Sequence, residues 1–581
     1  CLEIADVYDL YEDLKAEHGA IDFGDLIARP TELVESDSEV CGLLRNTYKH
    51  VLVDEYQDVN RASVRLLKAL HPDGKGLWAV GDAKQSIYRF RGASSANMNR
   101  FCGEDFANGQ SKSLRQNYRS FQEICDGFVG FARSGMAAAR ADVTADASRG
   151  ASGIRPAFVQ TTTREHEIDE IAARIQKFRD EGITFADQAV LCKGNARLSA
   201  IAKGLEKLGV PVLYLGPLFD RPEVKQALSL LSLLVDPRAA SLIAAAAMPE
   251  FSVPLNDIRN FAGLLRGKEA MAPLDWLDEI GRAEDISEEG RNGLAALAEA
   301  IRSCTPEDTP WRAFAAIYLD NSRLAARFSE VAHSGSPLPA IALWQLQNFL
   351  RTAEYDQRGL PISDLLRHIR RLAILSDERD LRDLPQSAQT LDAVRLMTIH
   401  GSKGLEFKAV HLPSLTSGSL PRSAKQNRSL PPPDGMLEGP VHNGVAAMAQ
   451  GHDEEQECLF FVALSRARDR LVLYTFCQNK SGGSIKPSPF VAGIQSLLRN
   501  EAPVTTTISS EVPPEAIKAE YDTPLQITPS EIAIYDKCPR RFLYTYAIRV
   551  SGQRTQTAFM QMHDAIQNLV DRLCSNTETE P

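Results

Sequence analysis

The chain has 581 residues, of which 44% are hydrophobic and 24% charged, and its formal net charge is −11. A single hydrophobic core rarely grows past about 250–300 residues, so this length predicts several domains, and the mild acidity limits any nucleic-acid binding to a local groove. Ten cysteines without a Cys-x-x-Cys pair, and no run of about 18 apolar residues, argue against a disulfide scaffold and a membrane span and favour a cytoplasmic protein.

Two short apolar runs near the start of the chain each end in a polar cluster. Residues 51–53 lead into the adjacent carboxylates Asp54 and Glu55, and residues 77–80 lead into a cluster that contains Gln85. The C-terminal ends of parallel strands share one edge of a sheet, where ligands bind in α/β folds. A carboxylate pair at such an edge is typical of enzymes that hold Mg²⁺ against a nucleotide and position the attacking water, although alone it could be a solvated turn.

Three more polar clusters follow downstream. Residues 114–120 contain Asn-Tyr-Arg, and a predicted strand at 394–398 runs into a turn at 400–404 that contains glycine and lysine. An amphipathic pattern at 454–470 predicts a helix that ends in arginines, just before another strand. The same strand-and-turn pattern occurs several times along the chain. It is therefore unlike an isolated solvated turn, the alternative for Asp54 and Glu55.

Together these clusters resemble motifs II to VI of the superfamily 1 helicases of the UvrD type. The strings at 81–91 and 462–467 resemble the RecB and AddA recombination branch more closely than UvrD itself. The resemblance implies an α/β fold with two RecA-like motor domains on parallel sheets, the first one incomplete, and a helical insertion. It also implies an ATP-dependent 3′-to-5′ DNA helicase or translocase, joined to a nuclease-like segment and acting in DNA repair or recombination.

The resemblance and the sequence patterns divide the chain into seven segments. Residues 135–150 are small, polar and weakly patterned, which predicts a mobile connection between the motor domains. Trp276, Trp311 and Trp344 stand at apolar positions of a helix-rich block and are expected in its core. The expected segments are the end of a 1B-like insertion at 1–36, the first motor domain at 37–145, the second motor domain at 151–235 and 391–480, a 2B-like insertion at 236–390, a linker at 481–525 and a nuclease-like segment at 526–581.

The resemblance implies ATP and Mg²⁺ as cofactors. A guanidinium keeps its charge and can fork onto phosphate oxygens, and an amide can both accept from water and donate to phosphate, which suits a γ-phosphate sensor. For the amide, the alternative is an ordinary surface residue. The implied roles are Mg²⁺ ligand for Asp54, positioning of the attacking water for Glu55, γ-phosphate sensor for Gln85, γ-phosphate contacts for Arg119 and Arg466, and nucleotide binding for Gly404 and Glu406.

The resemblance also implies contacts with single-stranded and duplex-end DNA. Tyr88 and Phe90 resemble an aromatic pair on which bases stack, an interaction that tolerates any base sequence. Thr398 and His400 would face the DNA backbone, although His400 could instead be a core histidine whose ring is satisfied by a carbonyl. The nearby arginines at 468 and 470 are expected to be solvated charges at a helix end. A second helicase–nuclease subunit is a candidate partner, and no membrane is implied.

One element that the resemblance requires is missing. The phosphate-binding string G-x-x-x-x-G-K-[ST] does not occur in the sequence. In the family this loop precedes the segment that residues 8–26 resemble, so the expectation is a chain that lacks the loop-bearing N-terminal part. The alternative function is a non-hydrolysing, helicase-like scaffold that binds DNA or a partner in a recombination complex. A metal-dependent nuclease subunit alone is a third reading.

The C-terminal segment has its own signature. Ser530 is a candidate N-cap for a helix, and Ile532, Tyr535 and Phe542 would form its apolar face. The segment resembles the opening helix of PD-(D/E)XK nuclease domains, in which His563 would contact a metal. The carboxylates for cleavage would then lie beyond residue 581.

An iron–sulfur cluster is a further possibility that the same resemblance raises. Cys538 would be one of its ligands, but only Cys574 follows nearby, and the family version needs more cysteines. A lone cysteine is more commonly a small buried apolar residue.

Overall fold

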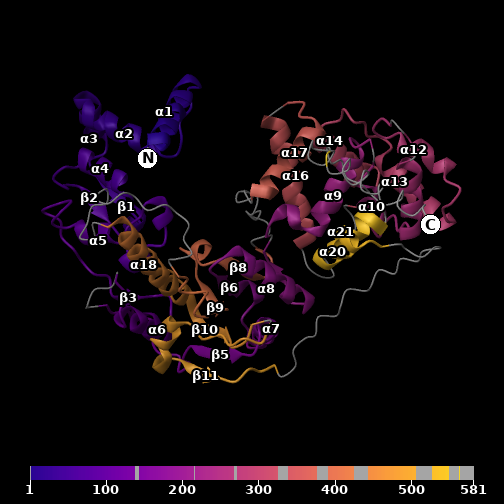
Figure 1. The fold of residues 1–581 in the computed structure, drawn as a ribbon. Coiled ribbons are helices and arrows are strands. Elements are labelled where there is room, and N and C mark those ends of the chain that lie inside the picture. The colour runs from indigo at the N-terminus through magenta and orange to yellow at the C-terminus, as the bar shows by residue number, and fades with distance from the viewer. Residues whose placement is uncertain are drawn as a thin grey trace, which may run out of the picture. The chain divides into compact units, whose positions relative to one another are not determined.

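The computed structural model divides into two units, which are described separately below (Figure 1). Unit 1 comprises Cys1–Tyr214 and Thr390–Glu511, and unit 2 comprises Leu215–Gln389 and Val512–Pro581. None of the described helices is long and apolar enough to cross a membrane. The structure describes residues 2–137, 143–214, 216–237, 239–266, 268, 271–322, 324, 338–356, 358–375, 390–423, 443–479, 481–505, 527–547 and 562.

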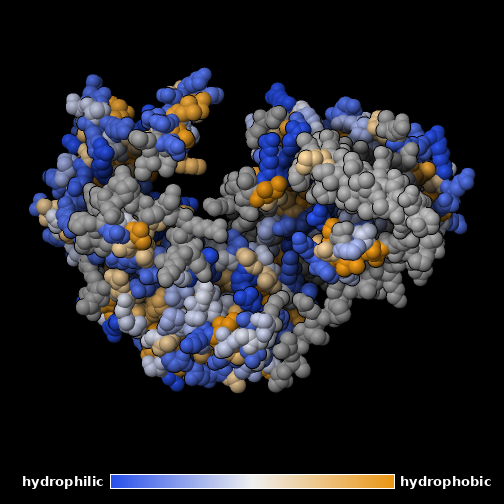
Figure 2. Space-filling view, in the orientation of Figure 1, coloured by the Kyte–Doolittle hydropathy of each residue, from blue (hydrophilic) through white to orange (hydrophobic). Residues whose placement is uncertain are grey.

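Unit 1 begins with helices that lead into a small parallel sheet. The Asp37 side chain caps one of these helices by accepting hydrogen bonds from two backbone N–H groups, and Asn60 caps a later one by accepting from the Ser63 N–H. Val7, Leu10 and Leu14 are exposed on the first helix, where Figure 2 shows a hydrophobic patch. The elements are α1 (Leu2–Glu17), α2 (Asp25–Ser36), α3 (Ser38–Thr47), β1 (Val51–Val53), α4 (Arg61–Leu70), β2 (Leu77–Ala79) and α5 (Ala96–Arg100).

Strands β1 and β2 pair in parallel, with Val51 opposite Leu77, and form the sheet of the expected first motor domain, called the first motor region below. Their side chains are only partly covered by the described residues. Leu52 is 79% exposed and Trp78 is 69% exposed. The C-terminal ends of β1 and β2 therefore lie at one edge of a two-stranded sheet, as the sequence predicted.

A seven-stranded sheet forms the core of the region expected to be the second motor domain. Its order is β11-β5-β10-β9-β6-β8-β7, and every pairing is parallel. All residues of β6 are buried, as expected for central parallel strands that are covered on both faces. This confirms the predicted α/β class. The strands are β5 (Ala157–Thr161), β6 (Gln188–Cys192), β7 (Val212–Leu213), β8 (Val394–Thr398), β9 (Phe407–Leu412), β10 (Ala467–Phe476) and β11 (Arg499–Glu501).

Two pairs of helices pack against this sheet. Helices α7 (Arg164–Asp180) and α8 (Asn195–Lys207) contact each other and the strands. Helices α6 (Gln122–Arg133) and α18 (Gly444–Leu464) contact each other and β10. Aromatic rings join the second pair at the positions Phe128–Phe461, with centroids 5.5 Å apart, and Phe131–Phe460, 4.8 Å apart. This packing fixes the C-terminal end of α18, which precedes the arginine cluster.

Several local expectations differ from the structure. Helix α18 ends at Leu464 and β10 starts at Ala467, so the arginines at 468 and 470 lie on a strand and not at a helix end. The first pairs with Glu406 and the second with Glu181, so these arginines are not simply solvated. Strand β11 falls inside the range expected to be linker, because it adds an edge strand beside β5. A short pair, β3 (Gln116–Asn117) with β4 (Asp146–Ala147), orders part of the expected mobile connection.

The described part of the expected insertion in unit 2 is helical. Trp276 is buried, as expected, whereas Trp344 is 42% exposed and Trp311 is half-buried. Both belong to amphipathic helices, and hydrophobicity alone did not separate their buried and open faces. The elements are α9 (Pro222–Leu233), α10 (Leu242–Ala246), α11 (Leu255–Arg266), α12 (Trp276–Glu279), α13 (Glu288–Ile301), α14 (Pro310–Ala315), α16 (Leu338–Asp356) and α17 (Ile362–Leu375).

The C-terminal segment of unit 2 contains helices α20 (Pro529–Lys537) and α21 (Pro539–Phe542). The N-cap is Thr528, not Ser530, because Thr528 and Glu531 form a reciprocal capping box. The rings of Tyr535 and Phe542 meet edge to face at 5.5 Å, as the predicted apolar face requires. His563 lies outside the described residues.

Candidate functional site

Asp54 and Glu55 follow β1 on a strained turn. Glu55 has φ 54° and ψ 40°, a left-handed conformation that costs a residue with a side chain about 1 kcal/mol or more. The Glu55 backbone N–H donates to Asp54 Oδ1 at 2.9 Å, and Gln57 Nε2 donates to Glu55 Oε2. Both carboxylates are exposed at the end of the strand. The turn therefore holds two carboxylates at the sheet edge that the sequence predicted.

Gln85 lies at the end of a short turn after β2 and is held from both sides. Its Nε2 donates to Asp82 Oδ2 at 3.0 Å, and its Oε1 accepts from Arg466 Nη2 at 3.2 Å. The amide thus connects the first motor region to the arginine that follows α18. Because the amide donates to Asp82 and accepts from Arg466, a shift of either partner would change its hydrogen bonding.

Arg466 is the most enclosed cation of the site, with 2% of its surface exposed. Besides Gln85, it donates to the carbonyls of Val462 at 3.1 Å and Leu405 at 3.3 Å, and to Ser465 Oγ at 2.9 Å. Burial is the main cause that lowers its pKa to about 10. The guanidinium is therefore still charged at neutral pH, although no carboxylate among the described residues bonds to it directly.

Arg119 lies between β3 and α6 and approaches the same stretch of chain. Its Nε donates to Glu406 Oε2 at 2.9 Å, and its Nη1 donates to the Ser465 carbonyl at 3.1 Å. The hydrogen bond from Arg119 lowers the pKa of Glu406, to which Arg468 also donates at 3.3 Å. Glu406 is therefore ionised and shared by two guanidinium groups, and Arg119 bonds to the carbonyl of the residue that precedes Arg466.

Lys403 is a functional residue to which the sequence reasoning gave no role. Its ammonium lies 3.3 Å from Glu55 Oε2, donates to the Gln85 carbonyl at 3.0 Å and bonds to Asp58 Oδ2. Its side chain is 6% exposed, so these contacts are made away from bulk water. A lysine inside a glycine-containing turn after a strand was the available signal, but only the fold shows which carboxylates it reaches.

The carboxylates of this edge suit a magnesium ion. Mg²⁺ in nucleotide sites uses one or two carboxylates together with water and phosphate oxygens. Asp54 offers an exposed carboxylate, and the buried Oδ1 of Asp58 has no hydrogen-bond partner among the described residues. Burial raises the pKa of Asp58 in spite of its bond to Lys403. An added cation would favour the ionised form of this group.

A second cluster, of aromatic rings, lies beside the carboxylate edge. The ring centroids of Tyr88 and Phe90 are 5.8 Å apart, and Arg91 lies over both rings at 5.3 and 5.7 Å. Phe90 is 66% exposed, so a large apolar ring faces solvent. The Lys403 ammonium lies 5.3 Å from the Tyr88 ring centroid. One lysine therefore contacts both the carboxylate edge and the aromatic cluster.

His400 joins the aromatic cluster through its ring. Its centroid is 5.9 Å from that of Phe90, and its Nε2 hydrogen-bonds with the Ile87 carbonyl at 3.1 Å. This carbonyl contact is the one that the core-histidine alternative predicts, and burial lowers the His400 pKa. Thr398 Oγ1 accepts from the Gly401 N–H at 3.1 Å, and Gly404 has φ 80°, so both shape the turn that follows β8.

Two predicted metal sites in the C-terminal segment receive no support from the described residues. His563 and Cys574 lie outside them, and Cys538 is exposed with a free thiol. No group of three or more His, Cys, Asp or Glu side chains that could hold a metal occurs in the described part of the chain.

Comparisons with known proteins match both parts of the chain. Residues 112–478 match the UvrD-like helicase C-terminal domain, and residues 2–106 match the UvrD/REP helicase N-terminal domain. The ATP-dependent DNA helicase PcrA of Bacillus subtilis is 26% identical over 491 residues, covering 81% of this chain and 60% of that protein. PcrA of Leuconostoc citreum is 26% identical over 527 residues, covering 86% and 64%. The chain therefore spans less than two thirds of the length of these relatives.

Proposed function

The chain belongs to the UvrD-like helicase family, and from that premise we propose that it works as an ATP-driven motor on single-stranded DNA. The observation that carries the proposal is the pair of contacts between its motor regions. Arg466 reaches the Gln85 amide at 3.2 Å, and Lys403 reaches Glu55 at 3.3 Å. Cations from the seven-stranded domain thus meet the polar edge of the first motor region.

In this proposal, Asp54 holds Mg²⁺, and Glu55 orients the water that attacks the γ-phosphate. Mg²⁺ and the arginines neutralise charge that develops on the phosphate oxygens, which is the main requirement of phosphoryl transfer. Arg466 and Arg119 supply guanidinium groups, and Gln85 senses the γ-phosphate. Because the two halves of this set come from different motor regions, a relative movement of those regions changes the site.

The aromatic cluster supplies the DNA contact. Phe90 offers an exposed ring for base stacking, which is worth about 1–3 kcal/mol per base and does not depend on sequence. Lys403 links this cluster to the carboxylate edge, because its ammonium contacts both. DNA bound at Phe90 can therefore alter the surroundings of Glu55.

Finer parts of the proposal rest on the resemblance alone. They are movement in the 3′-to-5′ direction, a role in repair or recombination of duplex ends, and a nuclease module that begins in the C-terminal segment. A strand-displacement assay on substrates with a single 3′ or 5′ overhang tests direction. Unwinding from the 5′ overhang alone would contradict the proposed polarity.

The alternative is a helicase-like scaffold that binds DNA without hydrolysing ATP. It is favoured by one observation, the absence of a phosphate-binding loop from the 581 residues. ATP hydrolysis by the chain joined to an upstream P-loop segment separates the two. We expect DNA-stimulated hydrolysis by the joined protein and background rates from the 581 residues alone.

The same joined protein tests the assigned role of Glu55. We expect Glu55→Gln to remove nearly all hydrolysis and to retain ATP binding, because the amide cannot polarise the attacking water. Glu104→Gln is the matched control, since Glu104 is an exposed carboxylate of the same region. Hydrolysis by Glu55→Gln at the rate of the control would contradict the role, and DNA binding without any hydrolysis in the parent would favour the scaffold.

A further inference from the structure

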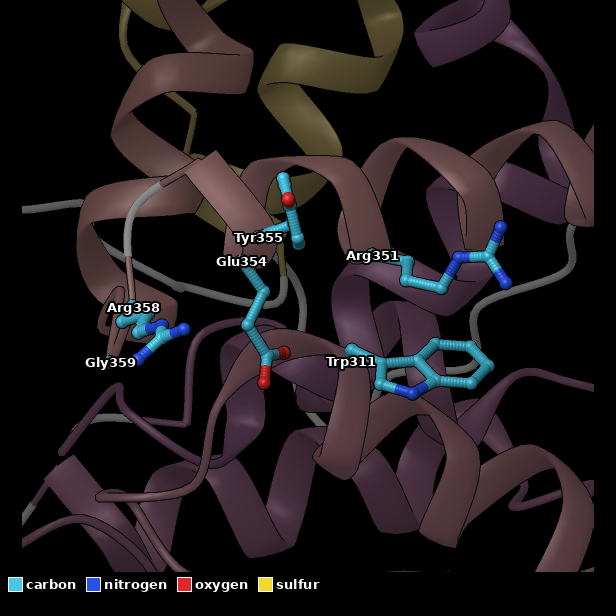
Figure 3. A pocket seen from close by; sticks show the side chains of 6 residues that line it. All are labelled: Trp311, Arg351, Glu354, Tyr355, Arg358 and Gly359. Atoms are coloured by element: carbon cyan, nitrogen blue, oxygen red, sulfur yellow. The ribbon is translucent and has the colours of Figure 1, made fainter.

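Unit 2 contains a pocket of about 330 Å³ that lies outside the motor machinery (Figure 3). Helix α14 contributes Trp311, and helix α16 contributes Arg351, Glu354 and Tyr355, with Arg358 just beyond its end. In Figure 3 the Glu354 side chain points from α16 toward α14, whereas Tyr355 extends to the other side. The volume lies within the range of small-molecule sites in proteins.

Trp311 gives the pocket a rigid aromatic wall. Its ring stacks on Phe314, with centroids 6.1 Å apart and planes 25° apart, and Phe314 stacks on Tyr318 at 4.7 Å. These contacts restrict the indole, which is half-buried and still lines the pocket. A planar ring that is held in place favours a flat, aromatic ligand.

Glu354 determines which flat ligand fits. Its Oε2 atom is buried and has no hydrogen-bond partner within the part of the chain that the structure describes. A buried carboxylate oxygen without a donor costs about 1–3 kcal/mol or more, so a ligand that donates to it is favoured. A carboxylate only accepts, and guanine presents two adjacent donors, N1–H and N2–H, on one edge. Adenine presents a donor beside an acceptor on that edge.

The two arginines give the pocket a positive rim. Arg351 and Arg358 are exposed, and neither forms an ion pair with the described residues. Two guanidinium groups against one carboxylate leave the pocket with a net positive charge. Guanidinium groups bind phosphate oxygens in a bidentate manner, so the rim suits a phosphate attached to the base.

From this combination we infer that the pocket binds a guanine nucleotide. The base stacks on Trp311, its two donors meet Glu354, and its phosphate lies between Arg351 and Arg358. The nucleotide is either a free guanine nucleotide or a guanine within a single strand of nucleic acid. The inference does not depend on the motor function, because none of these residues belongs to the motor site.

Equilibrium dialysis of the full chain with GMP, AMP and IMP tests the site. We expect GMP to bind at least about tenfold more tightly than AMP, because a site built for two donors rejects a base that lacks them. IMP, which lacks the N2 amino group, should fall between them. Equal binding of GMP and AMP, or no binding of GMP at millimolar concentration, would overturn the inference.

Variants assign the binding to this pocket. Glu354→Gln should lower GMP affinity by about tenfold or more, since a charged hydrogen-bond acceptor is lost. Glu299→Gln, at an exposed carboxylate of α13, should leave it unchanged, and both variants should unfold at the parent temperature. Equal GMP affinity in the two variants would overturn the inference.

A short oligonucleotide with one guanine in a thymine background identifies the source of the ligand. Displacement of GMP by this strand, together with weaker strand binding by Glu354→Gln, identifies nucleic acid. Failure of the strand to displace GMP identifies the free nucleotide, and the pocket assignment stands in both cases.

Discussion

The β1–β2 sheet and the seven-stranded sheet of unit 1 differ in how much of their surface the described residues cover. The strands of the first motor region expose Leu52 and Trp78, whereas the strands of the second are buried along most of their length. The candidate carboxylates stand on the open region, and the enclosed Arg466 stands on the packed one. Preorganised charges act best when a rigid scaffold holds them, so the packed sheet is suited to present the cation.

A matched pair of leucine substitutions sharpens this comparison and has the largest expected effect. Leu473→Ala in β10 removes a fully buried side chain and should lower the free energy of unfolding by about 2–5 kcal/mol. Leu52→Ala in β1 should change it by less than about 0.5 kcal/mol, because its side chain is exposed. Chemical denaturation followed by circular dichroism measures both. A larger loss from Leu52→Ala would show that the open sheet is packed in solution.

The open region also carries the proposed DNA contact. Phe90→Ala should weaken binding of single-stranded DNA by about 1–3 kcal/mol, because it removes a stacking surface. Phe23→Ala removes another exposed phenylalanine, from the helical start of the chain, and should leave DNA affinity unchanged. Fluorescence anisotropy with a labelled oligothymidine gives the two affinities. Equal weakening by the two variants would remove Phe90 from the DNA contact.

The packed sheet contains a buried histidine that makes its stability depend on pH. His411 Nδ1 hydrogen-bonds with the Tyr474 hydroxyl at 2.7 Å, Nε2 hydrogen-bonds with Gln188 Oε1 at 3.3 Å, and burial lowers the His411 pKa to about 3. Between its ordinary pKa near 6.5 and this value, only the unfolded chain takes up the proton, so stability falls as pH falls.

We expect acidification from pH 7 to pH 5 to cost about 1–2 kcal/mol through His411. In His411→Gln, the loss of unfolding free energy over this range should be smaller than in the parent protein by that amount. In His18→Gln, which replaces an exposed histidine, the loss should equal that of the parent. The same loss in His411→Gln as in the parent would show that His411 is protonated in the folded chain.

Sequence patterns predicted the strands and turns that depend only on residues close together in the chain. An apolar run followed by polar residues identified β1, β2 and β8, and the confirmed α/β class follows from them. The same rule placed Glu55 and Gln85 after strand ends, and a helical pattern placed Arg466 at the end of a helix. Their contacts with one another depend on residues hundreds of positions apart, which no local pattern encodes.

The differences between the sequence predictions and the structure also come from contacts between distant parts of the chain. The arginines after α18 were expected at a helix end, but pairing of β10 with β9 extends the strand back to Ala467. Lys403 was part of a recognised motif without a role, because its partners Glu55 and Asp58 come from the other motor region. The pocket in unit 2 was not foreseen, since Trp311 was expected in the core. Tertiary packing decides each of these features.

The central claim is that Arg466 completes an ATP site whose carboxylates lie on the open region. ATP hydrolysis in the presence of single-stranded DNA, measured in the protein joined to a P-loop segment, tests it most directly. Arg466→Lys keeps the charge and loses the guanidinium fork, so we expect hydrolysis to fall by about 10³ or more while ATP binding persists. Arg470→Lys, on the adjacent strand, should hydrolyse ATP at the parent rate. Hydrolysis by Arg466→Lys within twofold of Arg470→Lys would contradict the claim.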